Sequence, residues 1–575
     1  VHSPTSLHET NGSVKSESVR DGERTQDPHL LCCGSCLRRA RALMPLKYKE
    51  EMVRIVQLAG PVFISQLMVF MISVVSTVFC GHLGKTELAG VALAIAVINV
   101  TGISIGSGLS SACDTLISQT FGSKNLKRVG VILQRGALIL LLACFPCWAM
   151  FINTEPILLA TRQNPDVARL SQLYVKVFMP ALPAAFLYQL QGRYLQNQGI
   201  IWPQVVTGAA GNILNALINY IFLHLLDLGV AGSAAANSIS QFSLAVFLYI
   251  YIRWKGLHKA TWGGWSMECL QEWGSFIYLA IPSMLMLCLE WWTYEIAGFL
   301  AGLISEVELG AQSVIYEQAT VAYMLPLGFS VAATVRVGNA LGAGNTEQAK
   351  LSGKVSLLCA GEGEEIIQRV SKVMIIYSVF HIFDATAGVT GGIVRGAGKQ
   401  MIGALCSLVG YYFVGFPIGV SLMFATNMGL MGLWTGFCIC VFFQSAFFIL
   451  LLVKLDWKKA MEEVSNLVSE ISFIQQNKII QERPRSANKR VSIQSKTVSP
   501  EVDHADVEVP SKSVYEAGEE PVLSTIGEVL SVRQLVLRRG LAVFCMLLIL
   551  GGGIAANIFL TPLLSRSSDS PPQNP

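Results

Sequence analysis

Long apolar runs recur along this 575-residue chain and alternate with short polar stretches. Each run approaches the ~20 residues with which an α-helix crosses the hydrocarbon core of a bilayer. Twelve such runs lie at 55–80, 88–112, 129–152, 172–192, 204–226, 231–252, 274–300, 309–334, 370–394, 401–425, 430–453 and 540–563. The runs are continuous rather than alternating, and a helix satisfies its own backbone hydrogen bonds in lipid. The pattern therefore predicts transmembrane helices rather than a β-barrel.

The composition narrows the class further. Hydrophobic residues make up 52% of the chain and charged residues 14%, with a mean hydropathy of +0.51. Soluble domains carry roughly 25% charged residues, so this sequence is far more apolar than a protein that folds in water. The fold class that follows is an all-α polytopic membrane protein, with the lipid bilayer as its surroundings.

Basic residues in the loops predict the orientation of the spans. Thirteen lie on one side and three on the other when the spans alternate, and the richer side faces the cytosol. The thirteen are Arg38, Arg39, Arg41, Lys47, Lys49, Arg54, Lys124, Lys127, Arg128, Arg193, Arg253, Lys255 and Lys259, and the three are Lys85, Arg162 and Arg169. The amino terminus is expected in the cytosol, and the net charge of +4 implies no nucleic-acid partner.

The two halves of the chain repeat each other. Leu58–Pro61, Glu87–Gly90 and Gln119–Asn125 recur as Leu279–Pro282, Glu308–Ala311 and Asn339–Asn345. Pro61 and Pro282 are 221 positions apart, whereas Gly229 and Gly429 are only 200 apart, so the second half is about one helix short. Two repeats of a membrane chain usually form pseudo-symmetric bundles with a site near their interface. The duplication therefore indicates a transporter.

These patterns divide the chain into five parts. We expect a cytosolic tail at 1–50, a first bundle at 51–260, a second bundle at 261–453, a cytosolic linker at 454–538, and an accessory membrane helix with a short outer tail at 539–575. In the second bundle the apolar run stops at Ala360, and the polar stretch Gly361–Glu365 follows. The second bundle is therefore expected to be truncated near 355–369 and to lack its third helix.

Candidate chemistry lies where charge interrupts an apolar run. A carboxylate at mid-membrane costs several kcal/mol and usually faces a cavity with a function. Glu290, Glu295, Glu317 and Asp384 meet this condition, and all four belong to the second half. The alternative is that these acids pair with buried Arg or Lys and only hold helices together.

Aromatic residues accompany these acids at helical spacing. Glu290 is four residues before Tyr294, and Trp291 is four residues before Glu295. A carboxylate beside an aromatic face suits an organic cation, whose contact with the ring is worth ~0.5–2 kcal/mol. His381 lies three residues before Asp384, which places both on one helix face as a proton relay or as half of a metal site.

Other motifs point away from catalysis. The chain has no His-Glu-x-x-His, no Gly-x-Ser-x-Gly and no phosphate-binding glycine loop, so we expect neither an enzyme nor a cofactor. Cys32, Cys33 and Cys36 form a cluster that fits lipidation, or three ligands of a zinc site without its fourth, or no function. Lys489–Ser492 in the linker is typical of a basic-directed phosphorylation site at Ser492.

With its repeated halves and its acids inside apolar runs, the chain resembles the multidrug and toxic compound extrusion family, in particular its vertebrate organic-cation branch. The resemblance covers most of 45–460 and is strongest at Leu289–Trp292, Val335–Gly344, Gly391–Gly396 and Gly432–Gly436. It implies two six-helix bundles facing each other across a cavity, proton-coupled export of organic cations, and the plasma membrane, apical in epithelia.

The resemblance also implies roles for particular residues. It carries essential acidic positions onto Glu290, Glu295, Glu317 and Asp384, where the vertebrate relatives usually have Glu in place of Asp384. The cavity-lining residues that it implies are Gln66, Asn99, Trp291, Tyr294, Tyr316 and Tyr323, beside which we place His381.

The interpretation is an antiporter, expected to be monomeric, whose carboxylates hold either a proton or an organic cation. Burial favours the protonated form of a carboxyl group, so protons compete with cations near neutral pH. A one-unit pH gradient is worth about 1.4 kcal/mol, which sustains roughly a tenfold cation gradient. The alternatives are a sodium-coupled carrier, a lipid flippase, a non-transporting scaffold, or an inactive splice form with a strained connection at 346–369.

Overall fold

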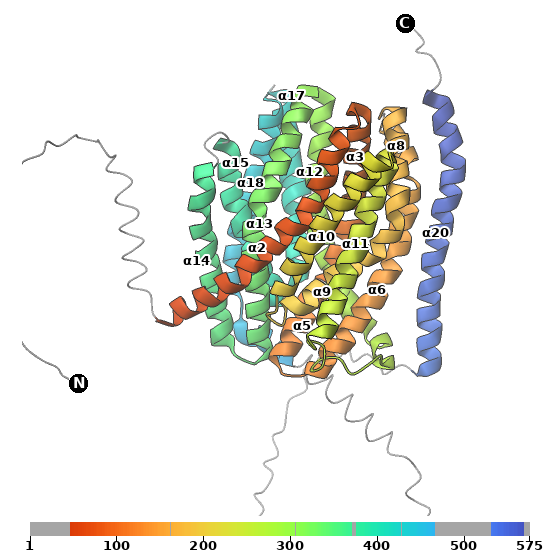
Figure 1. Ribbon diagram of the computed structural model, residues 1–575. Helices are drawn as coiled ribbons and strands as arrows, with labels where there is room; N and C mark the ends of the chain where they lie inside the picture. The colour runs from red at the N-terminus through yellow and green to blue at the C-terminus, as the bar shows by residue number, and fades with distance from the viewer. Residues whose placement is uncertain are drawn as a thin grey trace, which may run out of the picture. The chain divides into compact units, whose positions relative to one another are not determined.

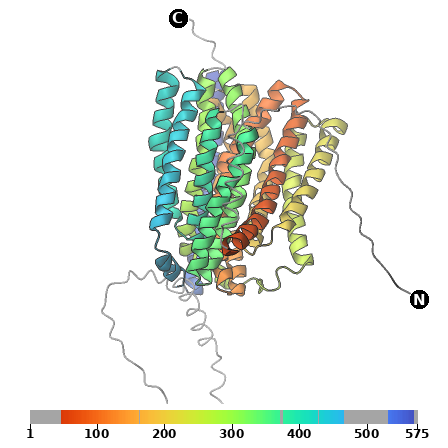
Figure 2. The same ribbon diagram turned by 90° about the vertical axis from the view of Figure 1, so that its left-hand side faces the viewer.

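The computed structural model describes residues 46–161, 163–304, 306–370, 375–426, 428–465 and 531–568. Cys32, Cys33, Cys36 and Ser492 lie outside the described residues, so their predicted modifications stay predictions. Residues from Glu51 onward cluster as one unit, and the regular elements in the described ranges are helices. Figures 1 and 2 show long helices side by side, as the hydropathy pattern predicted.

The first bundle is built from the helices before Lys255. Its elements are α2 (Leu46–Gly81), α3 (Lys85–Ile98), η1 (Asn99–Ile103), α4 (Ser104–Ser110), α5 (Ala112–Gly122), α6 (Leu126–Ile152), α7 (Thr154–Ala160), α8 (Pro165–Phe178), η2 (Met179–Ala181), α9 (Leu182–Gln196), α10 (Trp202–Tyr220), η3 (Ile221–Leu225) and α11 (Gly229–Trp254). The elements from Lys85 to Gly122 together make one span, interrupted by a π-helical turn at η1.

The second bundle follows a short 3₁₀ turn, η4 (Met267–Leu270). Its elements are α12 (Trp273–Ile304), α13 (Glu306–Gly342), α14 (Thr346–Val370), α15 (Ile375–Gly396), α16 (Gln400–Ser407), η5 (Leu408–Gly415), α17 (Phe416–Ala425) and α18 (Leu430–Lys454). Beyond the linker comes α20 (Val532–Ser568). Within the described residues, 11 helices are long and apolar enough to span a membrane, which confirms the all-α polytopic class.

The backbone supports the sequence repeat. Gly199 and Gly398 have φ of 77° and 76°, and Gly229 and Gly429 have φ of 54° and 57°. These left-handed conformations suit glycine, which lacks the Cβ that would clash there. Matching turns at matching places show that each half follows the same path at these points.

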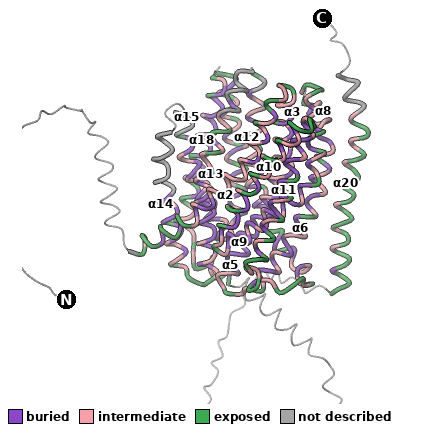
Figure 3. The backbone as a smooth tube through the Cα atoms, viewed as in Figure 1, coloured by how far each residue is buried: buried purple, intermediate pink, exposed green. Residues whose placement is uncertain are grey.

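Two large apolar cores, with smaller clusters beside them, hold the helices together, and Figure 3 marks the buried residues along the helices. One joins buried side chains between Ile72 and Ala280, and the other joins those between Met286 and Phe448. The start of α12 contributes Trp273, Phe276 and Ala280 to the first core, whereas its later residues belong to the second. Helix α12 therefore passes from one bundle to the other, which places its acids near the junction.

The truncation expected near 355–369 concerns a membrane span, and the structure has at this place a helix that is not among the spans of the described residues. Residues Thr346–Val370 form one continuous helix, α14, which packs against α13 and α15. The backbone thus fills the third helical place of the second bundle, although α14 is absent from the spans found among the described residues. Backbone hydrogen bonds of a helix form whatever its side chains are, so the polar stretch ends the apolar run without ending the helix.

Helix α20 is an addition to the first bundle and packs along α6 and α7 (Figure 1). The Asn153 side chain donates to the Gly553 carbonyl at 2.8 Å. Arg539 stacks 4.2 Å from the Trp273 ring centre and donates to the Leu270 carbonyl at 2.7 Å. These contacts tether an otherwise exposed apolar helix, as expected for an accessory span facing lipid.

Candidate transport site

Helix α12 carries Glu290, Trp291, Tyr294 and Glu295 where the two bundles meet. It packs against α4 of the first bundle and against α13 and α16 of the second. The Trp292 indole donates to the Val100 carbonyl at 3.1 Å, and the Cys288 thiol lies 3.6 Å from the Ser104 hydroxyl. The α12 acids therefore stand beside a helix that belongs to the opposite bundle.

Glu290 is the centre of a polar group drawn from three helices. The Tyr323 hydroxyl of α13 hydrogen-bonds to the Glu290 carboxyl, and Asp384 of α15 interacts with it electrostatically. Asp384 is 5% exposed, so its carboxyl is almost completely shielded from solvent. The structure thus brings together two of the four predicted acids and one predicted tyrosine.

Close packing between α13 and α15 makes this meeting possible. A Cβ on Gly388 would lie 3.0 Å from the Tyr323 hydroxyl oxygen, and one on Gly392 would lie 2.4 Å from the Ser330 carbonyl oxygen. The Ser330 hydroxyl donates to the Gly388 carbonyl at 2.7 Å, and Thr334 donates to the Gly392 carbonyl at 2.8 Å. Small residues at one-turn intervals let the backbones approach and hydrogen-bond.

The other two acids lie around Tyr316 instead. Glu295 on α12 and Glu317 on α13 both interact electrostatically with Tyr316, and Glu317 is exposed. The Tyr294 ring centre lies 5.9 Å from that of Tyr316, so rings from α12 and α13 meet next to these carboxylates. The four acids therefore form two neighbouring groups rather than a single cluster.

Hydropathy did not single out the aromatic residues that complete this second group. Tyr294 also contacts Trp434 and Phe437, with ring centres 6.4 and 6.5 Å apart, and Trp434 meets Phe380 at 5.2 Å. The Trp434 indole donates to the Gln312 side chain at 2.9 Å. These rings come from α15 and α18, belong to the apolar core of the second bundle, and support Tyr294 from behind.

The remaining predicted residues lie around these groups. Trp291 is half-buried, and His381 is 2% exposed, one turn from Asp384 on α15. Gln66 on α2 and Asn99 in the π-turn η1 are partly exposed residues of the first bundle. Within the described residues no group of three His, Cys, Asp or Glu side chains is arranged as metal ligands, so the half metal site at His381 gains no support.

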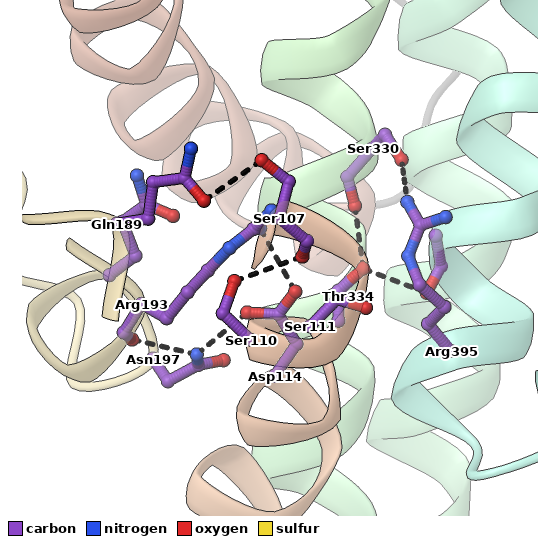
Figure 4. Close-up of polar contacts among 12 residues, drawn as sticks. Ser107, Ser110, Ser111, Asp114, Gln189, Arg193, Asn197, Ser330, Thr334 and Arg395 are labelled. Carbon is purple, nitrogen blue, oxygen red and sulfur yellow. Dashed lines mark hydrogen bonds and ion pairs between the residues drawn. The ribbon is translucent and has the colours of Figure 1, made fainter. Parts of the chain in front are cut away.

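Buried acids also occur in the first half, which corrects the sequence expectation that all lie in the second. Asp114 on α5 is 4% exposed, and Figure 4 shows Arg193 and Asn197 reaching it from the neighbouring α9 segment. The distances are 2.9 Å from the Arg193 guanidinium and 3.0 Å from the Asn197 amide. Asp114 is thus an ion-paired acid, the arrangement that holds helices together.

The bundles touch closely at the end where α5 and α13 finish. A Cβ on Gly342 would lie 1.9 Å from the Gln119 carbonyl oxygen, and one on Gly122 would lie 2.1 Å from that of Asn339. The Thr115 hydroxyl donates to the Arg395 carbonyl at 2.7 Å, and Gln119 donates to the Gly396 carbonyl at 3.2 Å. Glycine at the two repeated positions permits this backbone contact between the halves.

Glu51 forms a clamp across the same end. Its carboxylate, 2% exposed, accepts two hydrogen bonds from Arg336 of α13 at 2.8 and 2.6 Å. It also accepts from Gln348 and Ser352 of α14 at 2.8 and 2.7 Å. A bidentate Arg–carboxylate pair with further donors is a strong contact, so α2 of the first bundle is fastened to two helices of the second.

Two repeated helical bundles that meet around intramembrane acids and aromatic rings define a membrane transporter, not an enzyme. The MatE family profile matches residues 61–221 and 282–361. The chain is 66% identical to multidrug and toxin extrusion protein 1 of Danio rerio, covering 96% of this chain and 98% of that one, and 52% identical to the Homo sapiens protein of that name, covering 91% and 96%. The chain belongs to the multidrug and toxin extrusion transporter family.

Solved structures agree with this assignment. The crystal structure of the eukaryotic transporter AtDTX14 superposes with a TM-score of 0.70 at 27% identity, covering 73% of this chain and 99% of that one. A MATE structure in the bent conformation superposes with a TM-score of 0.63 at 16% identity, covering 72% and 96%, which shows the shared fold.

Proposed function

We propose that this protein exports organic cations in exchange for protons. The observation that carries the proposal is the meeting of half-buried Glu290 and Tyr323 with buried Asp384 at the junction of the bundles. Two carboxyls that share a site cannot both ionise at low cost, so they retain a proton until a cation arrives. Binding of the cation and release of the proton are then one event.

The aromatic rings supply the second half of the recognition. Tyr316 interacts with Glu295 and Glu317, its ring meets that of Tyr294, and in this proposal the faces of these two half-buried rings accept the apolar bulk of an organic cation. A carboxylate with a ring next to it recognises charge and hydrophobic area without demanding one shape. This chemistry fits broad substrate use, in keeping with the words multidrug and toxin in the names of the relatives.

Exchange requires that the site face one side of the membrane at a time. The Glu51 clamp and the contact at Gly122 and Gly342 support a state closed toward the end that the loop charges assign to the cytosol. Opening that end separates α2 from α13 and α14, and the carboxylate then loses its donors. The proposed location is the plasma membrane, with cations leaving the cell.

The proposal is tested with purified protein in proteoliposomes loaded with radiolabelled tetraethylammonium. An imposed pH gradient without sodium should drive flux that collapses when a protonophore dissipates the gradient. Flux that follows sodium and ignores pH would make the protein a sodium-coupled carrier. Cation binding without any flux would make it a scaffold or an inactive splice form, the alternative raised by the polar second half of α14.

A further inference from the structure

Arg395, near the end of α15, touches both bundles. Its guanidinium donates to the Ser330 hydroxyl of α13 at 2.8 Å (Figure 4). Its backbone carbonyl accepts from the Thr115 hydroxyl of α5 at 2.7 Å, and the next carbonyl, that of Gly396, accepts from Gln119 at 3.2 Å. The side chain therefore belongs to the second bundle, while its peptide is held by the first.

Charged and titratable groups face this guanidinium from several helices. Asp114 of α5 and Arg193 of α9 interact with it from the first bundle, and Glu290 of α12 and Tyr323 of α13 from the second. On its own helix, Asp384 interacts with the same Glu290 and Tyr323. Arg395 thus interacts electrostatically with an acid of each bundle.

The two acids differ in what else neutralises them. Asp114 has its own ion pair with Arg193 at 2.9 Å and a hydrogen bond from Asn197 at 3.0 Å. Glu290 has the Tyr323 hydroxyl, a neutral donor, and a second carboxyl, that of Asp384. Asp114 therefore keeps partners of its own, and the change of charge near Arg395 in the proposed cycle is the ionisation of Glu290.

We propose that Arg395 is a positioning residue of the transport cycle, which transmits the protonation state of Glu290 to the contact between the two bundles. This rests on the proposed function, in which Glu290 exchanges a proton for a cation. When Glu290 is protonated, the guanidinium is attracted across the interface to Asp114. When Glu290 releases its proton to water, the guanidinium is attracted to the new carboxylate, and the attraction between the bundles weakens.

An entering organic cation completes the cycle. It brings its own positive charge to Glu290 and displaces the guanidinium, which returns to the field of Asp114. The hydrogen bonds from Thr115 and Gln119 to Arg395 and Gly396 carry this movement to α5, because they hold the same short stretch of backbone. The contact between the bundles is then the same whether Glu290 holds a cation or a proton. Strict exchange requires this, because only a carrier with one of the two bound should change the side that it faces.

The test measures equilibrium binding of radiolabelled tetraethylammonium to the full-length protein against pH, together with maximal exchange rate. Arg395→Gln should move the pH midpoint of binding upward by about one unit, because the ionised Glu290 loses a neighbouring positive charge. Arg395→Lys should restore the midpoint but not the full rate, since lysine is a point charge without the planar fork of arginine. The matched control is Arg135→Gln on α6, which breaks an ion pair with Glu272 at 3.2 Å and should leave the midpoint unchanged.

A second variant keeps the inference testable if Arg395→Gln does not fold. Thr115→Val removes the hydrogen bond to the Arg395 carbonyl, together with the one that the hydroxyl accepts from Gln400, and keeps the side-chain volume. It should leave the binding midpoint unchanged and lower the maximal exchange rate at least threefold. A wild-type rate in Thr115→Val, or a wild-type midpoint in folded Arg395→Gln, would overturn the role of Arg395.

Failure of the proposed function gives a different result. If Glu290→Gln binds tetraethylammonium with the wild-type pH profile, Glu290 is not the exchanging acid and the proposed function is wrong at its centre. If Glu290→Gln abolishes the pH dependence while Arg395→Gln keeps the wild-type midpoint, only the inference about Arg395 fails.

Discussion

At equivalent positions the first bundle joins two helices by an ion pair, and the second bundle joins them by a hydrogen bond between uncharged groups. The repeat places Thr334 where the first half has Asp114, 220 positions earlier, and Gly392 where it has Arg193, 199 positions earlier. In the first bundle these positions form an ion pair at 2.9 Å. In the second, the Thr334 hydroxyl donates to the Gly392 carbonyl at 2.8 Å. The contact between these two helices is thus an ion pair in the first half and a hydrogen bond between uncharged groups in the second.

This difference assigns the halves separate roles. The first bundle neutralises its buried acid Asp114 in an ion pair with Arg193 at 2.9 Å. The second leaves Glu290 and Asp384 beside a tyrosine and beside each other. A buried ion pair holds helices together, whereas we propose that the two acids of the second bundle exchange protons and cations. In this proposal the duplicated fold provides one structural half and one half for the chemistry.

The largest effect is expected at Glu290. Glu290→Gln should lower pH-driven cation flux more than 100-fold while surface expression stays near wild type, because glutamine mimics the protonated acid and cannot attract a cation. Glu290→Asp should do less harm. Radiotracer flux in proteoliposomes, normalised to the amount of protein, measures both variants, and wild-type flux from Glu290→Gln would end the assignment.

The matching change in the first bundle should affect stability instead. Asp114→Asn leaves Arg193 without its ionic partner and should lower stability by about 3 kcal/mol, the lower range for breaking a buried pair. Flux per folded molecule should keep its wild-type pH dependence. Thermal unfolding followed by size-exclusion chromatography measures the first quantity. An altered pH profile without loss of stability would show that Asp114 belongs to the exchange chemistry.

The clamp between the bundles should control which side is open. Glu51→Gln weakens charge-assisted hydrogen bonds worth about 1.5–3 kcal/mol each. The closed contact at the cytosolic end should become less populated, and a cysteine placed at Asn339 should react at least fivefold faster with an impermeant maleimide. The matched control is Glu347→Gln, which removes an exposed pair with Lys350 on the same helix as Gln348. Equal labelling of both variants would contradict a gating role for Glu51.

The smallest effect concerns selectivity. Trp291→Ala should weaken binding of bulky aromatic cations by roughly 2- to 30-fold, the range that corresponds to ~0.5–2 kcal/mol of cation–ring contact. Small aliphatic cations should change less, because they cover little of the ring face. Competition binding with one cation of each class measures the ratio, and equal losses would reassign Trp291 to packing.

Much of the fold could be predicted from apolar run length alone. The membrane-spanning helices and the repeat follow from a local property of the sequence, since each span must be apolar along its whole length. Helix α14 could not be predicted in this way. Its polar stretch Gly361–Glu365 ends the apolar run, but the backbone continues as a helix to Val370 between α13 and α15.

The site could be predicted only in part, for a physical reason. Glu290 and Asp384 stand out because charge in an apolar run is locally visible. Arg395 and Arg193 lie at helix ends, where hydropathy cannot separate a loop charge from one that turns inward to Ser330 or Asp114. The pairing of Asp114 with Arg193, 79 positions away, is a property of the tertiary fold.

The central claim is that proton and cation compete for one group of carboxyls. The direct measurement is proton release when tetraethylammonium binds to purified protein in weakly buffered solution, followed with a pH-sensitive dye. We predict release of protons on cation binding near neutral pH, absent in Glu290→Gln and retained in Asp114→Asn. Cation binding to the wild-type protein without proton release would contradict the account.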